Sequence, residues 1–125
     1  MTATFTIDEI LTLDGAVLYG ATITPDQAFS ISTDSRAIDG SSNLYLALKG
    51  ERFDGHDFVL KAFENGAGLA IVDSDSLEAV LNGLSSEPKS SAPPVVSVPN
   101  TLAAYQGLAR LYLRKSSAKV IAITG

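Results

Sequence analysis

The chain has 125 residues, which is enough for one ordinary domain with a hydrophobic core and short for two. Apolar residues make up 46% and charged residues 18%, a composition that excludes a disordered tail and a coiled coil. The net charge is −5 and the nine Lys and Arg residues are scattered, which leaves no basic patch for duplex nucleic acid. The absence of cysteine excludes disulfides and thiolate zinc sites, and a single histidine disfavours a metal site made by the protein alone.

The N-terminus has no basic segment followed by an apolar core, so it does not resemble a secretory signal. No apolar run approaches the roughly 20 residues that a membrane-spanning helix requires. We therefore expect a cytoplasmic protein that contacts neither a membrane nor nucleic acid.

In chain order, the first half predicts a short helix after the capping residue Thr6, closed by Gly15, and then a brief strand at 17–20. A turn at 24–26 leads into a strand at 29–33, where apolar and polar residues alternate. The next strand begins at Leu44. Residues 56–64 carry the apolar stripe of an amphipathic helix, and residues 69–73 form an apolar run typical of a strand covered on both faces.

The second half predicts a helix at 76–84, an exposed loop rich in Ser and Pro at 85–94, and a strand at 95–98. A long helix then opens at Thr101 and ends near the basic residues Arg114 and Lys115. The apolar stripe of this helix, from Leu102 to Tyr112, and that of the helix at 56–64, from Phe58 to Phe63, are assigned to the core. The strand, helix and strand over 44–73 form a right-handed βαβ unit. The fold class predicted is therefore α/β, a three-layer domain with a mixed β-sheet flanked by helices.

The last residues, 119–125, read as a buried strand that stops on Gly125. A β-branched strand leading into Thr124 and Gly125 is how a phosphate-binding P-loop begins, although many buried strands end in glycine. On these residues alone the structural interpretation is favoured over the P-loop. The apolar ending also suggests a fragment of a longer protein.

Two polar clusters lie on either side of the strand that begins at Leu44. In the first, Thr33, Asp34, Ser35 and Arg36 place two hydroxyls, a carboxylate and a guanidinium directly after a strand. These groups can bind a base, a ribose or a phosphate. The alternative is an Asp turn with a solvated arginine, and the four residues do not decide between them.

The second cluster runs from Lys49 to His56. Its glycines allow a ligand close to the backbone, Phe53 could cover a planar ring, and Lys49 or Arg52 could meet phosphate. The alternative is a glycine-rich connection with Phe53 in the core. His56 is interpreted as a helix-start residue bonded to a neighbouring loop, because it lacks a sequence-local partner carboxylate with the spacing of a catalytic pair. No nucleophile with an adjacent base is visible.

In order and spacing, several segments together resemble the N-terminal domain of the Mur ligases: 32–36, 44–58, Ala62, and Gly66 with Ala67. The similarity spans nearly the whole chain, including residues 98–102 before the long helix and 120–125 at the end. Within the family, residues 49–58 favour the type that adds D-alanyl-D-alanine to UDP-N-acetylmuramoyl-tripeptide in peptidoglycan synthesis.

The resemblance implies that residues 1–118 bind the UDP part of a UDP-N-acetylmuramoyl-peptide. It implies that 119–125 are the first strand of a central domain, in which Thr124 and Gly125 start the P-loop. The full-length enzyme would be an ATP- and Mg²⁺-dependent amide ligase, whereas this piece alone would hold no catalytic residue, metal or cofactor. The UDP-binding residues carried over are Thr33, Asp34, Ser35, Arg36, Lys49, Gly50, Glu51, Arg52 and Phe53.

Two alternatives stay open at this point. The related ligase that adds the third amino acid of the peptide stem shares the Asp-Ser-Arg and Asp-Gly signals. A non-catalytic interaction module resembling the N-terminal domain of HPr kinase/phosphorylase has a similar general architecture.

Overall fold

The computed structural model describes residues 3–84 and 93–124, with side chains described as far as Lys115. Six strands form one sheet in the order β1-β3-β4-β5-β6-β2. Their bounds are β1 (Thr4–Thr6), β2 (Val17–Tyr19), β3 (Ala28–Ser32), β4 (Asn43–Leu46), β5 (Leu69–Asp73) and β6 (Val95–Val98). The predicted exposed loop falls largely on residues 85–92, which lie outside the described residues.

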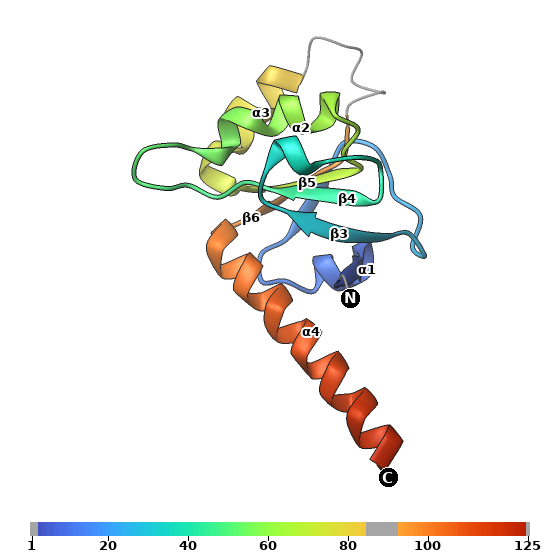
Figure 1. Cartoon of the computed structure of the whole chain (residues 1–125). Helices are drawn as coiled ribbons and strands as arrows, with labels where there is room; N and C mark the ends of the chain where they lie inside the picture. Colours follow the sequence, from blue (N-terminus) through green and yellow to red (C-terminus); the bar gives the residue numbers. More distant parts are fainter. Residues whose placement is uncertain (1–2, 85–92, 125) are drawn as a thin grey trace.

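The four central strands, β3 to β6, are parallel, and the two edge strands are antiparallel to their neighbours. The sheet is therefore mixed, as predicted. Helices follow the parallel strands and cover both faces of the sheet (Figure 1). The helices are α1 (Ile7–Leu11), α2 (Val59–Glu64), α3 (Leu77–Leu84) and α4 (Thr101–Thr124), with three short 3-10 helices, η1 (Ser35–Ala37), η2 (Gly55–Phe58) and η3 (Ser74–Ser76).

Two apolar clusters, one on each face of the sheet, make the core. Because successive strand residues point to opposite faces, Leu44 and Leu46 join one cluster while Tyr45 and Ala47 join the other. The first cluster packs against α1 and α4, and the second against α2 and α3. This arrangement confirms the three-layer α/β fold, with α2 and α3 on one side of the sheet and α1 and α4 on the other (Figure 1).

The strand predicted at the end of the chain is wrong in this structure. The helix α4 continues through residues 119–123 to Thr124. A strand needs a neighbouring strand for its backbone hydrogen bonds, and no strand in the described part of the chain pairs with this segment. A helix satisfies the same groups internally, so the helix that starts at Thr101 continues.

Two apolar stripes assigned to the core are only partly buried. Phe58 is 44% exposed although its neighbours Val59 and Ala62 are buried. On α4, Leu102 and Tyr105 are exposed while Leu108 is fully buried. No helix in the described ranges combines the length and the apolar character needed to cross a membrane.

Candidate functional site

The two polar clusters predicted from the sequence lie at the same edge of the sheet. Strands β3 and β4 are parallel neighbours, with Ser32 opposite Tyr45. The segments that follow them therefore leave the sheet at one end, where ligands bind in open α/β sheets. This placement agrees with the expectation that the clusters flank a common pocket.

The first cluster is held by a carboxylate cap. Asp34 Oδ1 accepts a hydrogen bond of 2.9 Å from the Arg36 main-chain N–H, which starts η1. The Arg36 guanidinium also donates two hydrogen bonds of 3.1 Å to the Asp34 carboxylate. These bonds hold the pKa of Asp34 below its ordinary value. The side chain of Asn65, at the end of α2, donates a hydrogen bond of 2.9 Å to the Ser35 carbonyl. This bond connects the first cluster to the helix.

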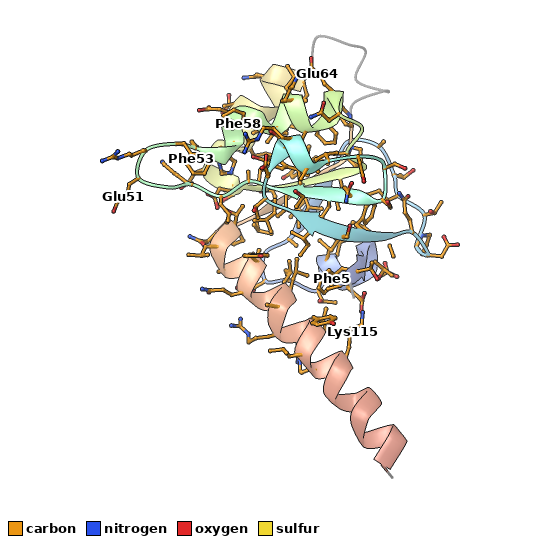
Figure 2. The ribbon with its side chains drawn as sticks, in the orientation of Figure 1. Phe5, Glu51, Phe53, Phe58, Glu64 and Lys115 are labelled. Atoms are coloured by element: carbon orange, nitrogen blue, oxygen red, sulfur yellow. The ribbon has the colours of Figure 1, made fainter. Side chains whose placement is uncertain are left out.

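The second cluster is a narrow projecting turn. Lys49 and Asp54 form an antiparallel bridge, and the Gly50 N–H donates 2.9 Å to the Phe53 carbonyl. The Phe53 ring rests against Gly50, where an added Cβ would lie 3.3 Å from a ring carbon. Glu51 and Arg52 are exposed at the tip, and Figure 2 shows Glu51 pointing away from the rest of the molecule.

A cavity of about 700 Å³ lies between the clusters. Its volume is in the range of small-molecule sites. It is lined by Thr33, Asp34, Ser35, Arg36, Tyr45, Phe53, Phe58 and Lys61. The structure thus brings the whole first cluster together with Phe53, but residues 49–52 do not line this cavity.

Lys49 and Gly50 instead border a second cavity of about 520 Å³, which reaches Asn100 and Thr101 at the start of α4. Phe53 lines both cavities. The interpretation of Phe53 as a core residue is wrong, because its side chain is 60% exposed.

Three residues of the first cavity were missed by the sequence interpretation: Tyr45, Phe58 and Lys61. Phe58 is the N-cap of α2 and Lys61 lies in the first turn of that helix, and both side chains line the first cavity. A tyrosine inside an apolar strand is a signal that could have been used, since a buried hydroxyl requires a hydrogen-bond partner.

Tyr45 joins the two clusters. Its hydroxyl donates a hydrogen bond of 2.7 Å to the carbonyl of Gly55, which lies in the second cluster. Burial and the nearby carboxylates of Asp34, Asp54 and Asp57 raise the pKa of Tyr45 to about 12. The residue is therefore a neutral hydrogen-bond donor at neutral pH.

His56 does have a partner carboxylate, contrary to the interpretation from the sequence. Asp54, two positions earlier, lies 2.6 Å from His56 Nδ1 and also caps η2. The Asp73 N–H donates a hydrogen bond of 2.9 Å to His56 Nε2, so the ring is bonded to the last residue of β5 and not to a loop. Because Nε2 accepts this bond, the ring proton lies on Nδ1. Asp73 in turn accepts 2.7 Å from the Thr101 N–H. The ring thus connects the second cluster, the end of β5 and the start of α4.

The predicted start of the P-loop cannot be placed in the site. Gly125 and the side chain of Thr124 lie outside the described residues. Within the described residues, no group of three or more His, Cys, Asp or Glu side chains could hold a metal ion.

Two capped turns around one cavity, at the edge of four parallel strands, define an α/β domain suited to a polar small molecule. The profile of the Mur ligase family, catalytic domain, matches residues 27–113, more than half of the chain. The chain belongs to the Mur ligase family.

The relatives are similar over most of this chain. It is 38% identical over 95 residues, 76% of its length, to UDP-N-acetylmuramoyl-tripeptide–D-alanyl-D-alanine ligase of Bacillus subtilis. It is 37% identical over 99 residues, 77% of its length, to UDP-N-acetylmuramoyl-L-alanyl-D-glutamate–2,6-diaminopimelate ligase of Prochlorococcus marinus. Each alignment covers 18% of the relative.

A crystal structure of MurF from Acinetobacter baumannii superimposes on 94% of this chain with a TM-score of 0.67 and 28% identity, and 22% of that protein is covered. The chain therefore spans about a fifth of the length of these relatives. The family match therefore supports the interpretation as a Mur ligase domain, and not the alternative of a domain like that of HPr kinase/phosphorylase.

Proposed function

We propose that this chain is the UDP-substrate-binding part of an ATP-dependent ligase that adds D-alanyl-D-alanine to UDP-N-acetylmuramoyl-tripeptide. The observation that carries the proposal is the convergence of Thr33–Arg36 and Phe53 on one cavity of about 700 Å³. This cavity offers hydroxyls and charged groups for a ribose and phosphates, and an aromatic ring for a base. Lys49–Arg52, on the same turn as Phe53, complete the proposed UDP site.

The longer protein would divide at about residue 118. We propose that residues 1–118 hold the substrate and that 119–125 belong to a following ATP-binding domain, together with Thr124 and Gly125. The relatives are about five times longer than this chain, which leaves room for such a domain. We propose that ATP and Mg²⁺ bind in that following domain and that this chain alone does not carry out a catalytic step.

The second candidate is the ligase that adds diaminopimelate as the third amino acid of the stem. The 37% identity to the Prochlorococcus marinus enzyme favours it almost as well as the 38% identity to the Bacillus subtilis enzyme favours the first. Phosphate release by the full-length protein separates the two candidates. D-Alanyl-D-alanine with the tripeptide substrate should support turnover, whereas turnover only with diaminopimelate and the dipeptide substrate would establish the second candidate.

Substrate binding by the chain is tested with an amide NMR titration. UDP-N-acetylmuramoyl-tripeptide should shift the signals of Ser32–Arg36 and Lys49–Phe53 and leave those of α3 in place. UDP alone should reproduce most of these shifts, while D-alanyl-D-alanine alone should produce none. Shifts confined to other parts of the sheet would refute the site.

A further inference from the structure

The first cavity contains one positive charge without a counter-charge. Asp34 and Arg36 neutralise each other through a bidentate ion pair, in which both N···O distances are 3.1 Å. Of the charged residues that line the cavity, this leaves Lys61, whose ammonium makes no hydrogen bond or ion pair with the described residues. Among the residues that line the cavity, Lys61 is therefore the cation that is not paired with a carboxylate, and an anionic group of a ligand would be attracted to it.

The same cavity also exposes two phenyl rings. Phe53 is 60% exposed and Phe58 is 44% exposed, and both border this cavity. Phe53 comes from the projecting turn and Phe58 from the start of α2, next to one another in Figure 2. Exposed aromatic rings that share a cavity with a few polar groups are typical of a binding site for a planar ligand.

The two rings differ in how they are held. Phe53 sits on a turn closed by the Gly50 to Phe53 hydrogen bond and leans on Gly50. Phe58 is fixed by the helix that it starts, and Val59 and Ala62 anchor that helix in the core. The position of Phe58 is thus set by a helix packed on the core, whereas Phe53 lies on a loop that projects from the sheet.

The two polar clusters do not supply an equivalent unpaired cation to this cavity. Arg52 is exposed at the tip of the turn and Lys49 borders the second cavity rather than the first. Lys61 lies one helical turn after Phe58, so its ammonium and the Phe58 ring reach the same cavity from one helix face. A ligand with a planar ring and a neighbouring anionic group matches this pair of side chains.

We propose that Phe58, the residue that caps the N-terminus of α2, and Lys61 of α2 are binding residues of this site. Phe58 together with Phe53 holds the planar base, and Lys61 contacts the phosphates that follow it. This inference rests on the proposed function, because it takes a uridine nucleotide as the ligand. It adds α2 as a third element of the site beside the two polar clusters.

The test compares the dissociation constants of uridine and UDP, measured by NMR titration of the whole chain. Lys61→Gln should raise the dissociation constant of UDP about tenfold and leave that of uridine within about twofold, because only UDP carries phosphates. Phe58→Ala should raise both constants about tenfold, as expected for loss of a base-stacking ring. Phe58→Tyr keeps the ring and should bind both ligands almost as the unaltered chain does.

Matched controls exclude general effects of charge and fold. Arg110→Gln removes the same charge from α4 on the opposite face of the sheet, and Leu60→Ala removes an exposed apolar side chain of α2. Both should leave the two dissociation constants unchanged, and all variants should keep the dispersed amide spectrum of the unaltered chain.

The outcomes separate this inference from the proposed function. If UDP shifts Thr33–Arg36 and Phe53 but Lys61→Gln and Phe58→Ala bind normally, the role of α2 is wrong and the UDP site stands. If UDP leaves the signals of Thr33–Arg36 and Phe53 in place, both are wrong.

Discussion

Tyr45 is the residue at which the core and the site meet. Its ring is 2% exposed and packs with the cluster under α2 and α3, while its edge borders the first cavity. Its hydroxyl donates a hydrogen bond to the carbonyl of Gly55, which lies in the second polar cluster. The geometry of the site therefore depends on a hydrogen bond made inside the core.

Tyr45→Phe should lower the free energy of unfolding by about 1–2 kcal/mol, because the Gly55 carbonyl loses its buried donor. Its pKa is raised from 10.0 to about 12, so the contribution of the hydroxyl is present below pH 10 and is lost as the pH rises towards 12. Urea unfolding measures the loss in the free energy of unfolding.

The raised pKa of Tyr45 is measured by the absorbance of tyrosinate as the pH rises. One group should ionise at a higher pH than the others, and this step should be absent in Tyr45→Phe and present in Tyr19→Phe. An unchanged titration in Tyr45→Phe would contradict the assignment.

Asp54 is the second residue whose ionisation matters. Burial raises its pKa, but hydrogen bonds from the His56 main chain and ring lower it by more, so the net pKa lies below 3.8. A lowered pKa means that the ionised group stabilises the fold above its ordinary value and that this contribution is lost as the pH falls through the folded-state value.

Asp54→Asn should therefore reduce stability by about 1–2 kcal/mol at pH 7, since His56 loses an ionised partner. The difference from the unaltered chain should shrink as the pH is lowered below 3.8. Urea unfolding at pH 7 and at low pH measures both. The exposed neighbour Asp57, changed to Asn, serves as the control, and a pH-independent difference for Asp54→Asn would argue against the ionic contribution.

Both polar clusters contain an aspartate that caps a 3-10 helix. Asp34 starts η1 and Asp54 starts η2, and each carboxylate accepts the main-chain N–H two residues later. An Asp at such a turn satisfies backbone donors that would otherwise be unpaired. This explains how a short connection after a strand can hold its polar groups in a fixed arrangement.

Gly55 allows the second of these turns to lie close to β4. A Cβ on Gly55 would lie 2.7 Å from the Leu48 carbonyl oxygen, and the Gly55 N–H donates 2.8 Å to the same oxygen. Gly55→Ala should lower the free energy of unfolding by about 1–3 kcal/mol, because backbone atoms must move apart. Gly83→Ala on α3 has open space and should raise it by about 0.5–1 kcal/mol. Thermal and urea unfolding of both variants measure the difference, and equal effects would show that the close approach is not required.

The sequence was sufficient to predict elements whose periodicity is strong. The buried run at 69–73 became β5, and Thr6 caps α1 with Glu9 as its partner. The end of α4 was not predictable, because an apolar β-branched run forms a strand only where a neighbouring strand is available. Phe58 was assigned to the core because helical spacing alone does not say which edge of the apolar stripe meets solvent.

The site was predictable only in part for a similar reason. Thr33–Arg36 is a contiguous cluster, so its chemistry is visible in sequence order. Lys61 and Asn65 reach the first cluster from across the fold, which no local pattern reveals. The same holds for the bond between His56 and Asp73, which depends on β4 and β5 being neighbours.

In the molecule as a whole, the site lies where two parallel strands end and where α2 begins. β3 supplies the first cluster, β4 leads to the second, and α2 closes the cavity between them. On the opposite face, Lys115 of α4 binds Glu9 at 2.9 Å and lies 5.6 Å from the centre of the Phe5 ring. That contact joins α4 to the first strand and helix, away from the cavity.

The contact of Lys115 should therefore affect stability and not ligand binding. Lys115→Ala should lower the free energy of unfolding by about 0.5–1 kcal/mol at low salt. The loss should be smaller at high salt, because both partners are partly exposed and salt screens their attraction. Urea unfolding at two salt concentrations measures the loss, with Arg114→Ala as the exposed control. A loss of UDP affinity in Lys115→Ala would show that the two faces of the sheet are coupled.

The segments after β3 and β4 are proposed to form one nucleotide site. Intermolecular nuclear Overhauser effects between UDP and the chain test it most directly. We predict contacts from the uracil H5 and H6 protons to the Phe53 ring and from the nucleotide to the Thr33 methyl group. Contacts instead to Tyr105 and Ala109, in the groove between α4 and β1 on the opposite face, would contradict the account.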